Sequence, residues 1–224
     1  MTARLPDCLI FDLDGTILHS LPGIEYSVRE AFARCQLPYR NVDLRRLIGP
    51  PISTILSIVG DIQDSEKLDS LVQAFRSSYD SEGWRKTELF PDARNVLEAL
   101  SQNGHRMFVV SNKPQKISVR ILDHLDIRRL FETIMTRDSL FPSYSGKAEM
   151  LLALAHDHHI DLHQALVVGD SIEDAKASAE AGAPFAFMAH GYGEMDSSAP
   201  APVLLKLDGF AQFLPLIAKE LVHD

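Results

Sequence analysis

The chain contains little cysteine and no long apolar run. Its two cysteines among 224 residues, Cys8 and Cys35, lie in an apolar segment and in a segment of helical periodicity. Isolated cysteines in such segments are typical of buried free thiols, and they indicate neither a disulfide nor a metal site. No apolar run reaches the ~18 residues of a membrane span, and no basic-then-apolar leader is present. We therefore expect a cytoplasmic protein with no membrane partner.

Positive charge is also scarce. The chain has 22 Lys and Arg residues against 31 Asp and Glu residues, which gives a formal net charge of -9 at pH 7. Proteins that bind the nucleic-acid backbone gather Lys and Arg on one face, so we expect no nucleic-acid partner. A small anionic substrate held at one local positive site remains compatible with this balance. The hydrophobic fraction of 46% and the charged fraction of 24% are typical of a globular protein.

Short apolar runs rich in β-forming residues alternate with longer segments of helical periodicity. This alternation predicts an α/β fold whose parallel sheet is covered by helices on both faces. In such a sheet the functional loops follow the carboxyl ends of the strands. A weak strand and an amphipathic helix are expected after residue 193. The main expected strands are 8–11, 107–110, 133–135, 165–168 and 184–188.

A helical insertion is expected after the first strand. Roughly ninety residues separate the first two expected strands, far more than one crossover helix needs. The sequence therefore predicts a helical cap domain at residues 20–86 and a core domain formed by residues 1–19 and 87–224. Apolar residues recur at helical spacing in 24–35 and in 65–80, and "IGPPIS" at 48–53 interrupts them.

Acidic residues follow two of the expected strands. Asp12 and Asp14 come after the first strand in "DLDGT", and Asp170 and Asp174 come after the fourth in "GDSIEDA". If these strands are neighbours, the carboxylates converge on a small volume and repel one another unless a cation lies between them. Oxygen ligands suit Mg²⁺, which usually also bridges to a substrate phosphate. Turn and helix-cap roles are the alternative interpretation of both pairs.

Hydroxyl and positive groups lie where they could hold a phosphate. Ser111, Asn112 and Lys113 end the second expected strand, and Thr16 can donate a hydrogen bond or cap the next helix. Lys147 opens a helix, where its charge opposes the helix dipole unless solvent or an anion surrounds it. An ordinary surface lysine is the alternative for Lys147.

Four motifs in order resemble those of the haloacid dehalogenase superfamily, and specifically its phosphatases with a small helical cap. They are "DLDGT" at 12–16, "VVSN" at 109–112, the isolated Lys147 and "GDSIEDA" at 169–175. The resemblance implies a doubly wound, Rossmann-like parallel sheet with its first and fourth strands adjacent at the centre. "IGPP", "SNKP", "AGA" and "HGYG" resemble the phosphoglycolate phosphatases in particular, whereas His19, Ala148 and "FPDA" depart from that subgroup.

The resemblance also implies a mechanism. Asp12 would be the nucleophile that forms an aspartyl-phosphate, and Asp14 would act as general acid and then as general base. Mg²⁺ would be held by Asp12, the backbone carbonyl of Asp14 and Asp170, with Asp174 orienting these ligands. The implied substrate-binding set is Thr16, Ser111, Asn112 and Lys147.

The cap is expected to recognise the part of the substrate beyond the phosphate. It would open and close on hinges near residues 18–20 and 86–90. Gly49 and Pro50 are the candidates for a specificity loop, and Arg46 could pair with a substrate carboxylate, with a solvated arginine as the alternative. The four histidines of "HDHHIDLH" at 156–163 lack the spacing of a metal site and are interpreted as solvated helix-end residues.

These features predict a Mg²⁺-dependent phosphatase for a small phosphorylated metabolite, with 2-phosphoglycolate as the leading candidate. Pyrophosphate, a nucleoside monophosphate and a sugar phosphate are alternative substrates, and a phosphomutase of the same superfamily is an alternative enzyme. A phosphate-binding regulatory protein without turnover is the alternative outside enzymes. The expected oligomeric state is a monomer or a homodimer.

Overall fold

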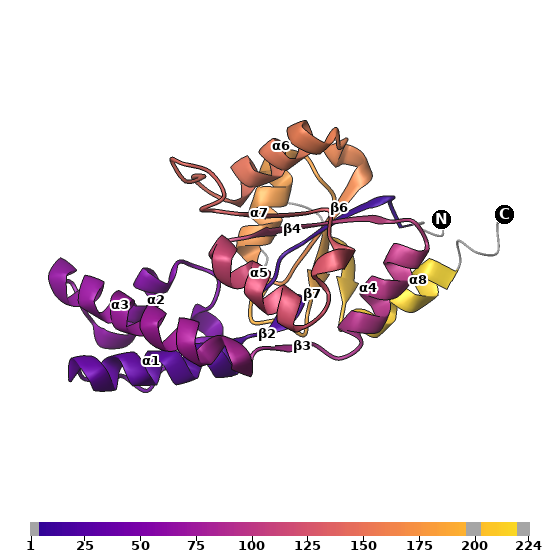
Figure 1. Cartoon of the computed structure of the whole chain (residues 1–224). Helices are drawn as coiled ribbons and strands as arrows, with labels where there is room; N and C mark the ends of the chain where they lie inside the picture. The colour runs from indigo at the N-terminus through magenta and orange to yellow at the C-terminus, as the bar shows by residue number, and fades with distance from the viewer. Residues whose placement is uncertain (1–4, 196–202, 219–224) are drawn as a thin grey trace.

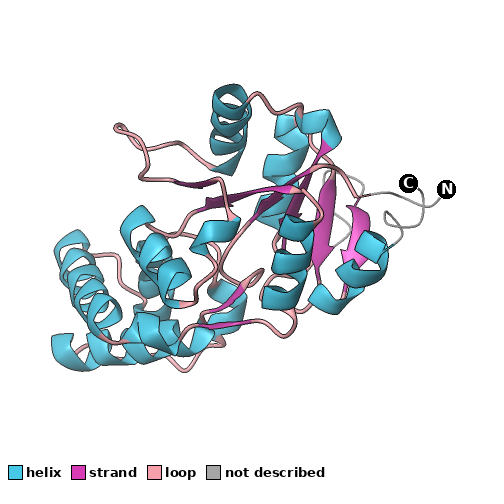
Figure 2. Ribbon diagram, turned by 45° about the vertical axis from the view of Figure 1, so that its right-hand side comes forward, coloured by secondary structure: helices cyan, strands magenta, loops and turns pink. Residues whose placement is uncertain are grey.

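A six-stranded parallel sheet forms the centre of the protein (Figures 1 and 2). The computed structural model describes residues 5–195 and 203–218. The strands lie in the order β5-β4-β1-β6-β7-β8, and the ends of the five main expected strands agree with the structure to within one residue. The parallel α/β fold is thus confirmed. The strands are β1 (Cys8–Phe11), β4 (Arg106–Ser111), β5 (Thr133–Thr136), β6 (Ala165–Gly169), β7 (Phe185–Met188) and β8 (Val203–Leu207).

Helices cover both faces of the sheet, which explains why the strands are almost continuously apolar. Alternate side chains of β1 point to opposite faces: Leu9 and Phe11 join one apolar core, and Cys8 and Ile10 join the other. The first core contains residues of α4 (Ala93–Gln102), α5 (Gln115–His124) and α8 (Leu214–Ala218), and the second contains residues of α6 (Lys147–His158) and α7 (Ile172–Ala181). Short 3-10 helices connect some of these elements: η3 (Arg128–Leu130), η4 (Leu162–Gln164) and η5 (Phe210–Phe213).

The strand order places the polar segments that follow β4, β1 and β6 side by side. Phe11 of β1 pairs with Val109 of β4 on one side and with Val168 of β6 on the other. The expected adjacency of the first and fourth core strands is therefore confirmed. The chain lays β4 and β5 on one side of β1 and then β6, β7 and β8 on the other. Open α/β sheets bind ligands at the carboxyl ends of the strands where the order reverses in this way.

The helical insertion lies beside the core and forms the cap (Figure 1). It begins after β2 (Leu18–His19) and ends before β3 (Glu88–Leu89), two short strands that pair antiparallel. Its elements are α1 (Leu21–Cys35), η1 (Leu44–Leu47), α2 (Ile52–Gly60), α3 (Ser65–Ser81) and η2 (Gly83–Lys86). The two expected helices are present as α1 and α3, and α2 begins within the "IGPPIS" segment. Domain boundaries at residues 20 and 86 stay a prediction.

Both cysteines are free thiols. Cys8 is buried in β1, and Cys35 is partly exposed at the end of α1. Burial raises the pKa of the Cys8 thiol to about 11, so it stays protonated at neutral pH. None of the helices in the described ranges has the length and apolar character needed to span a membrane.

Candidate active site

The chain turns sharply after β1 and brings two acidic segments together. The backbone N–H of Asp12 still donates to the carbonyl of Val168 in β6, at 2.9 Å. Gly15 follows with φ +86°, and a Cβ atom at this position would lie 2.2 Å from Oδ2 of Asp170. Only glycine satisfies both the backbone conformation and this close approach. The turn therefore lets the segment after β1 lie directly against the segment after β6.

Three carboxylates meet at this point. Asp12, Asp170 and Asp174 are all buried, and each contributes an oxygen to a group whose members lie within 4.8 Å of one another. Lys147 of α6 reaches into the group, with its Nζ 3.1 Å from Oδ1 of Asp12 and 2.5 Å from Oδ1 of Asp174. Its side chain is only 6% exposed, so it is not an ordinary surface lysine. These two carboxylates are the anions that stabilise its charge at the start of α6.

Asp170 is held by backbone and hydroxyl donors. One of its oxygens accepts a hydrogen bond from Oγ1 of Thr16 at 3.1 Å. The other accepts from the backbone N–H groups of Tyr192 and Gly193, at 2.7 and 3.2 Å. The "HGYG" segment thus fixes the orientation of an acidic side chain. The contact of Thr16 is with Asp170, and its expected role in substrate binding stays a prediction.

Asp174 combines a structural contact with a contact inside the acidic group. Oδ2 of Asp174 accepts from the backbone N–H of Ser171, whose hydroxyl accepts from the N–H of Asp174, and the two residues form a capping box at the start of α7. The helix-cap interpretation is therefore correct for this residue. Its other oxygen binds Lys147, so one carboxylate fixes the helix and the lysine together.

The buried group carries more negative than positive charge. Burial raises the pKa of Asp12 to about 7, with the charge of Lys147 opposing the rise and the charges of Asp174 and Asp170 adding to it. Burial and the charge of Asp174 raise the pKa of Asp170 to about 6. Burial alone lowers the pKa of Lys147, but the charges of Asp12 and Asp174 raise it above its ordinary value. One ammonium against three carboxylates leaves two negative charges unbalanced when all are ionised.

This group fits a divalent metal ion. Two unbalanced charges match one divalent cation, and carboxylate oxygens are the ligands that hard cations prefer. Oδ1 of Asp12 is buried and accepts no hydrogen bond, and its one polar contact is the ion pair with Lys147 at 3.1 Å, so it can still accept a metal ligand bond. Among the described residues, no other cluster of three or more His, Cys, Asp or Glu side chains has suitable geometry.

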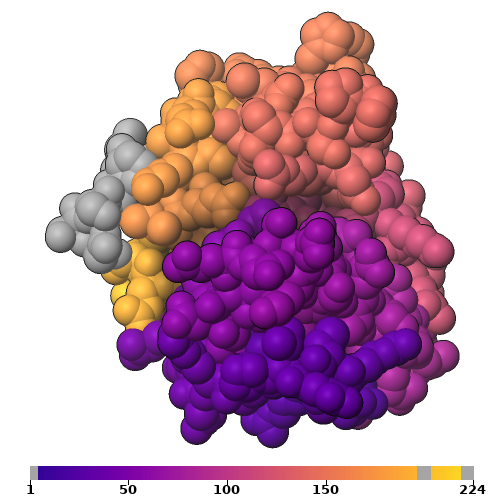
Figure 3. All heavy atoms as spheres, turned by 90° about the vertical axis from the view of Figure 1, so that its left-hand side faces the viewer, coloured from indigo at the N-terminus to yellow at the C-terminus, as the bar shows by residue number. Residues whose placement is uncertain are grey.

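A cavity of about 550 Å³ opens onto this site between the core and the cap. Figure 3 shows the boundary between the cap, in indigo to purple, and the core, in salmon to orange, with a recess along it. Gly49 contributes to the cap wall and has φ +134°, a conformation that favours glycine. The cap wall also contains Ile24, Ile48, Ile52, Ile55 and Phe75, and the core wall contains Asp12, Asp14, Ser111, Asn112, Lys113 and Lys147.

Two residues after β4 connect the core to the cap. Nδ2 of Asn112 donates to Oε1 of Glu173 at 2.8 Å and to the carbonyl of Gly49 at 3.4 Å. Lys113 places its Nζ 2.9 and 3.0 Å from the two carboxylate oxygens of Asp14, and 2.9 Å from the hydroxyl of Tyr79 in α3. Sequence reasoning identified Asn112 and Lys113 but missed Tyr79. The apolar stripe of α3 predicted that Tyr79 is buried, but not that its hydroxyl faces a lysine of the core.

The expected carboxylate-binding arginine lies elsewhere. Arg46 is not in the cavity wall, and its side chain is 72% exposed. Its Nε lies 3.6 Å from Oδ2 of Asp43, and its Nη2 lies 3.8 Å from Oε1 of Glu194. Other cations line the cavity instead, namely Arg76, Lys116, Arg120 and Arg137. Sequence reasoning missed these four. The sequence held one indication for Arg76, namely its position directly after Phe75, a residue of the buried apolar stripe of α3.

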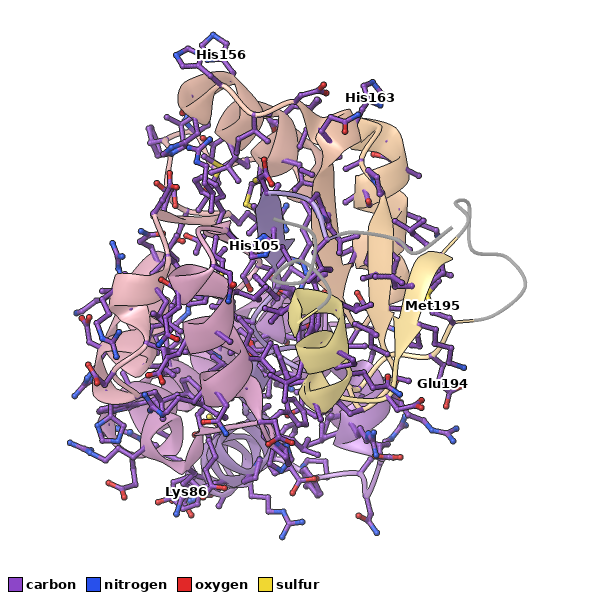
Figure 4. All side chains as sticks on the ribbon, turned by 90° about the vertical axis from the view of Figure 1, so that its right-hand side faces the viewer. Lys86, His105, His156, His163, Glu194 and Met195 are labelled. Atoms are coloured by element: carbon purple, nitrogen blue, oxygen red, sulfur yellow. The ribbon has the colours of Figure 1, made fainter. Side chains whose placement is uncertain are left out.

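The histidines of "HDHHIDLH" lie away from this site. His156 is 89% exposed, and Figure 4 shows His156 and His163 at the end of the core opposite the cap residue Lys86. His158 is not simply solvated, since its Nε2 lies 2.9 Å from the hydroxyl of Thr133. No metal-ligating cluster among the described residues includes any of these histidines.

Comparison with known proteins shows the family. Residues 9–188 match the family model of the haloacid dehalogenase-like hydrolases. The chain belongs to this family. The match extends from β1 to β7, so it contains the cap and all four acidic residues.

Several relatives and structures resemble the chain over most of its length. The phosphoglycolate phosphatase of Pasteurella multocida is 30% identical over 216 residues, which is 92% of this chain and 96% of that enzyme. The tyrosine-protein kinase PtkA of Mycobacterium tuberculosis is 32% identical over 193 residues, which is 85% of this chain and 65% of that protein. A haloacid dehalogenase-like hydrolase from Streptococcus pneumoniae shares the fold with a TM-score of 0.83, at 23% identity, over 94% of this chain and 97% of that one.

The raised pKa values predict how a divalent cation affects stability. Asp12 and Asp170 bind protons more tightly in the metal-free folded chain than in the unfolded chain, so the stability they contribute falls as pH rises from about 4 through about 7. A cation relieves this loss only where the carboxylates are ionised. We expect Mg²⁺ to raise the melting temperature, relative to EDTA, more at pH 8 than at pH 5.

The control for this measurement is Asp170→Asn, which removes one of the charges. The variant should show a smaller Mg²⁺-dependent rise in melting temperature at pH 8 than the parent chain. An equal rise at both pH values in the parent would contradict a cation site formed by these carboxylates.

Proposed function

We propose that the protein is a Mg²⁺-dependent phosphatase that hydrolyses a small phosphomonoester through an aspartyl-phosphate. The observation that carries this proposal is the buried acidic group at the end of β1, which leaves two negative charges unbalanced, faces Lys147 and opens onto the cavity. A phosphoryl group is a dianion and needs a cation to approach such a group. Membership of a hydrolase family agrees with this chemistry.

Asp12 and Asp14 divide the reaction between them. In the first step an oxygen of Asp12 attacks phosphorus, the bond from phosphorus to the ester oxygen breaks, and Asp14 gives a proton to that oxygen. In the second step Asp14 takes a proton from a water molecule whose oxygen attacks phosphorus, the bond from phosphorus to the Asp12 oxygen breaks, and inorganic phosphate leaves with Asp12 restored as a carboxylate. Both side chains line the cavity, so one bound substrate can contact both.

The remaining core residues would bind the metal and the phosphoryl group. Asp12, Asp170 and the backbone carbonyl of Asp14 would hold Mg²⁺, which when bound offsets the repulsion between the carboxylates and the phosphoryl oxygens. Ser111 and Lys147 would hold those oxygens, because positioned positive and polar groups supply most of the catalysis of phosphoryl transfer. Asp174 would not contact the phosphoryl group itself but would orient Lys147, which donates to its carboxylate.

The cap would enclose the substrate. We propose that residues 20–86 act as one cap domain attached through the β2–β3 ribbon. Arg45 of the cap already contacts the core, since its guanidinium donates to the carbonyls of His190 and Gly191 at 3.2 and 2.6 Å. Asn112 and Gly49 form a second contact across the cavity. A closed cap would exclude water while the ester bond breaks.

The leading substrate is 2-phosphoglycolate. Several relatives are named phosphoglycolate phosphatases and match the chain over most of its length. The cations of the cavity wall can pair with a carboxylate on the substrate. Arg76 of α3 is the best placed of the cap residues, because it lines the cavity and Arg46 does not.

The catalytic proposal is tested by phosphate release from p-nitrophenyl phosphate and from 2-phosphoglycolate, with Mg²⁺ or with EDTA. We expect turnover only with Mg²⁺, and a loss of about 10³-fold or more in Asp12→Asn, because the amide cannot form the aspartyl-phosphate. Turnover by Asp12→Asn at the parent rate would remove Asp12 as the nucleophile. Mg²⁺-dependent binding without turnover would indicate a regulatory protein, and transfer of phosphate to a sugar or a protein tyrosine would indicate a transferase.

The substrate proposal predicts opposite results for two arginines. Arg76→Ala should raise KM for 2-phosphoglycolate by about tenfold, as expected for the loss of a charged hydrogen bond, and should leave KM for p-nitrophenyl phosphate nearly unchanged. Arg46→Ala should change neither value. The reverse result, in which only Arg46→Ala raises KM for 2-phosphoglycolate, would indicate that Arg46 and not Arg76 binds the substrate carboxylate.

A further inference from the structure

Lys113 forms a buried contact between the core and the cap. It follows β4, and its side chain is 5% exposed. Its ammonium lies between the carboxylate of Asp14, at 2.9 and 3.0 Å, and the hydroxyl of Tyr79, at 2.9 Å. Burial lowers the pKa of Lys113, but the charge of Asp14 and the contact with Tyr79 raise it above its ordinary value, so the ammonium stays charged.

The Tyr79 side chain is held firmly within the cap. Its ring stacks on Phe75 of α3, with a centroid distance of 5.4 Å and an interplanar angle of 13°. Gly83 of the cap also packs closely against it, since a Cβ atom at Gly83 would come 2.9 Å from Cδ2 of Tyr79 and 2.1 Å from Oγ of Ser27. The side chain is 5% exposed. The ring that carries the hydroxyl is therefore packed against residues of the cap itself.

The backbone of Lys113 is fixed to the core. Its N–H donates to Oγ of Ser111 at 3.3 Å, and its carbonyl accepts from Oγ of Ser118 at 3.3 Å. The lysine is thus anchored at one end by the core and at its ammonium by a cap residue. Asp14 is the third member of this chain of contacts, and its side chain is 19% exposed, so solvent can reach it.

We propose that Tyr79 and Lys113 are positioning residues for Asp14. The Tyr79 hydroxyl fixes the ammonium, and the ammonium contacts both carboxylate oxygens, so Asp14 faces the ester oxygen only while the cap covers the cavity. When the cap moves away, Tyr79 moves with α3 and the ammonium loses one of its two partners. This couples proton transfer to the enclosure of the substrate, and it rests on the proposed role of Asp14 as acid and base.

The test uses Tyr79→Phe, which removes the hydroxyl and keeps the ring. Glycerol 2-phosphate and 2-phosphoglycolate have alkoxide leaving groups that need a proton as the bond breaks, whereas p-nitrophenolate leaves without one. The value of kcat/KM reports the steps up to this bond cleavage. We expect kcat/KM for the alkyl phosphates to fall about tenfold and kcat/KM for p-nitrophenyl phosphate to fall less than about twofold.

Two further variants separate positioning from a structural effect. Tyr26→Phe is the matched control, because Tyr26 is a cap tyrosine whose ring lies under the ammonium of Lys86, 4.8 Å away, and outside the cavity wall. It should behave as the parent chain does. In Lys113→Met, adding Tyr79→Phe should cause no further loss on the alkyl phosphates, because Tyr79 acts through Lys113.

The results that overturn the inference differ from those that overturn the proposed function. An equal loss on both classes of substrate in Tyr79→Phe, or no loss on either, removes Tyr79 as a positioning residue while the phosphatase proposal stands. A further loss when Tyr79→Phe is added to Lys113→Met also overturns it. Absence of turnover in the parent chain, or full turnover in Asp12→Asn, overturns both the phosphatase proposal and the positioning role of Tyr79.

Discussion

The repulsion among the buried carboxylates of Asp12, Asp170 and Asp174 is the constraint on which the rest of the site depends. Lys147 offsets one of their charges, and burial together with the remaining negative charge keeps the pKa values of Asp12 and Asp170 high. Burying uncompensated charge is costly, so a fold selected for stability alone would not assemble this group. The arrangement becomes favourable when a divalent cation and a phosphoryl group bind, and this is why we interpret it as a catalytic site.

The surrounding structure serves to hold these charges together. The order of the strands places the end of β1 beside the ends of β4 and β6, and Gly15 allows the closest approach. The "HGYG" segment orients Asp170 through backbone donors, and the capping box of α7 orients Asp174. The cap covers the cavity and supplies apolar residues, Arg76 and the Tyr79 hydroxyl. We propose that the core carries out the chemistry of the phosphate, and that the cap encloses the substrate and recognises the rest of it.

Most of the core could be predicted from the sequence because its signals are local. Apolar runs predicted the ends of the five main strands to within one residue, and the resemblance to the haloacid dehalogenase superfamily implied the adjacency of β1 and β6. The two-residue strands β2 and β3 were not predicted, since such short pairs leave no periodic pattern. The contact of Tyr79 with Lys113 and the place of Arg76 in the cavity depend on how the cap packs against the core. That packing joins residues distant in the chain and has no local signal, so the sequence did not show that Arg46 lies outside the cavity wall. The pairing of Arg46 with a substrate carboxylate stays a prediction.

The most direct test of the central claim is the anomalous diffraction of crystals grown with Mn²⁺, which takes the same oxygen ligands as Mg²⁺. The account predicts one anomalous peak in contact with the carboxylates of Asp12 and Asp170 and with the backbone carbonyl of Asp14. Mn²⁺ bound only elsewhere, or no bound Mn²⁺ at a concentration that supports turnover, would contradict it.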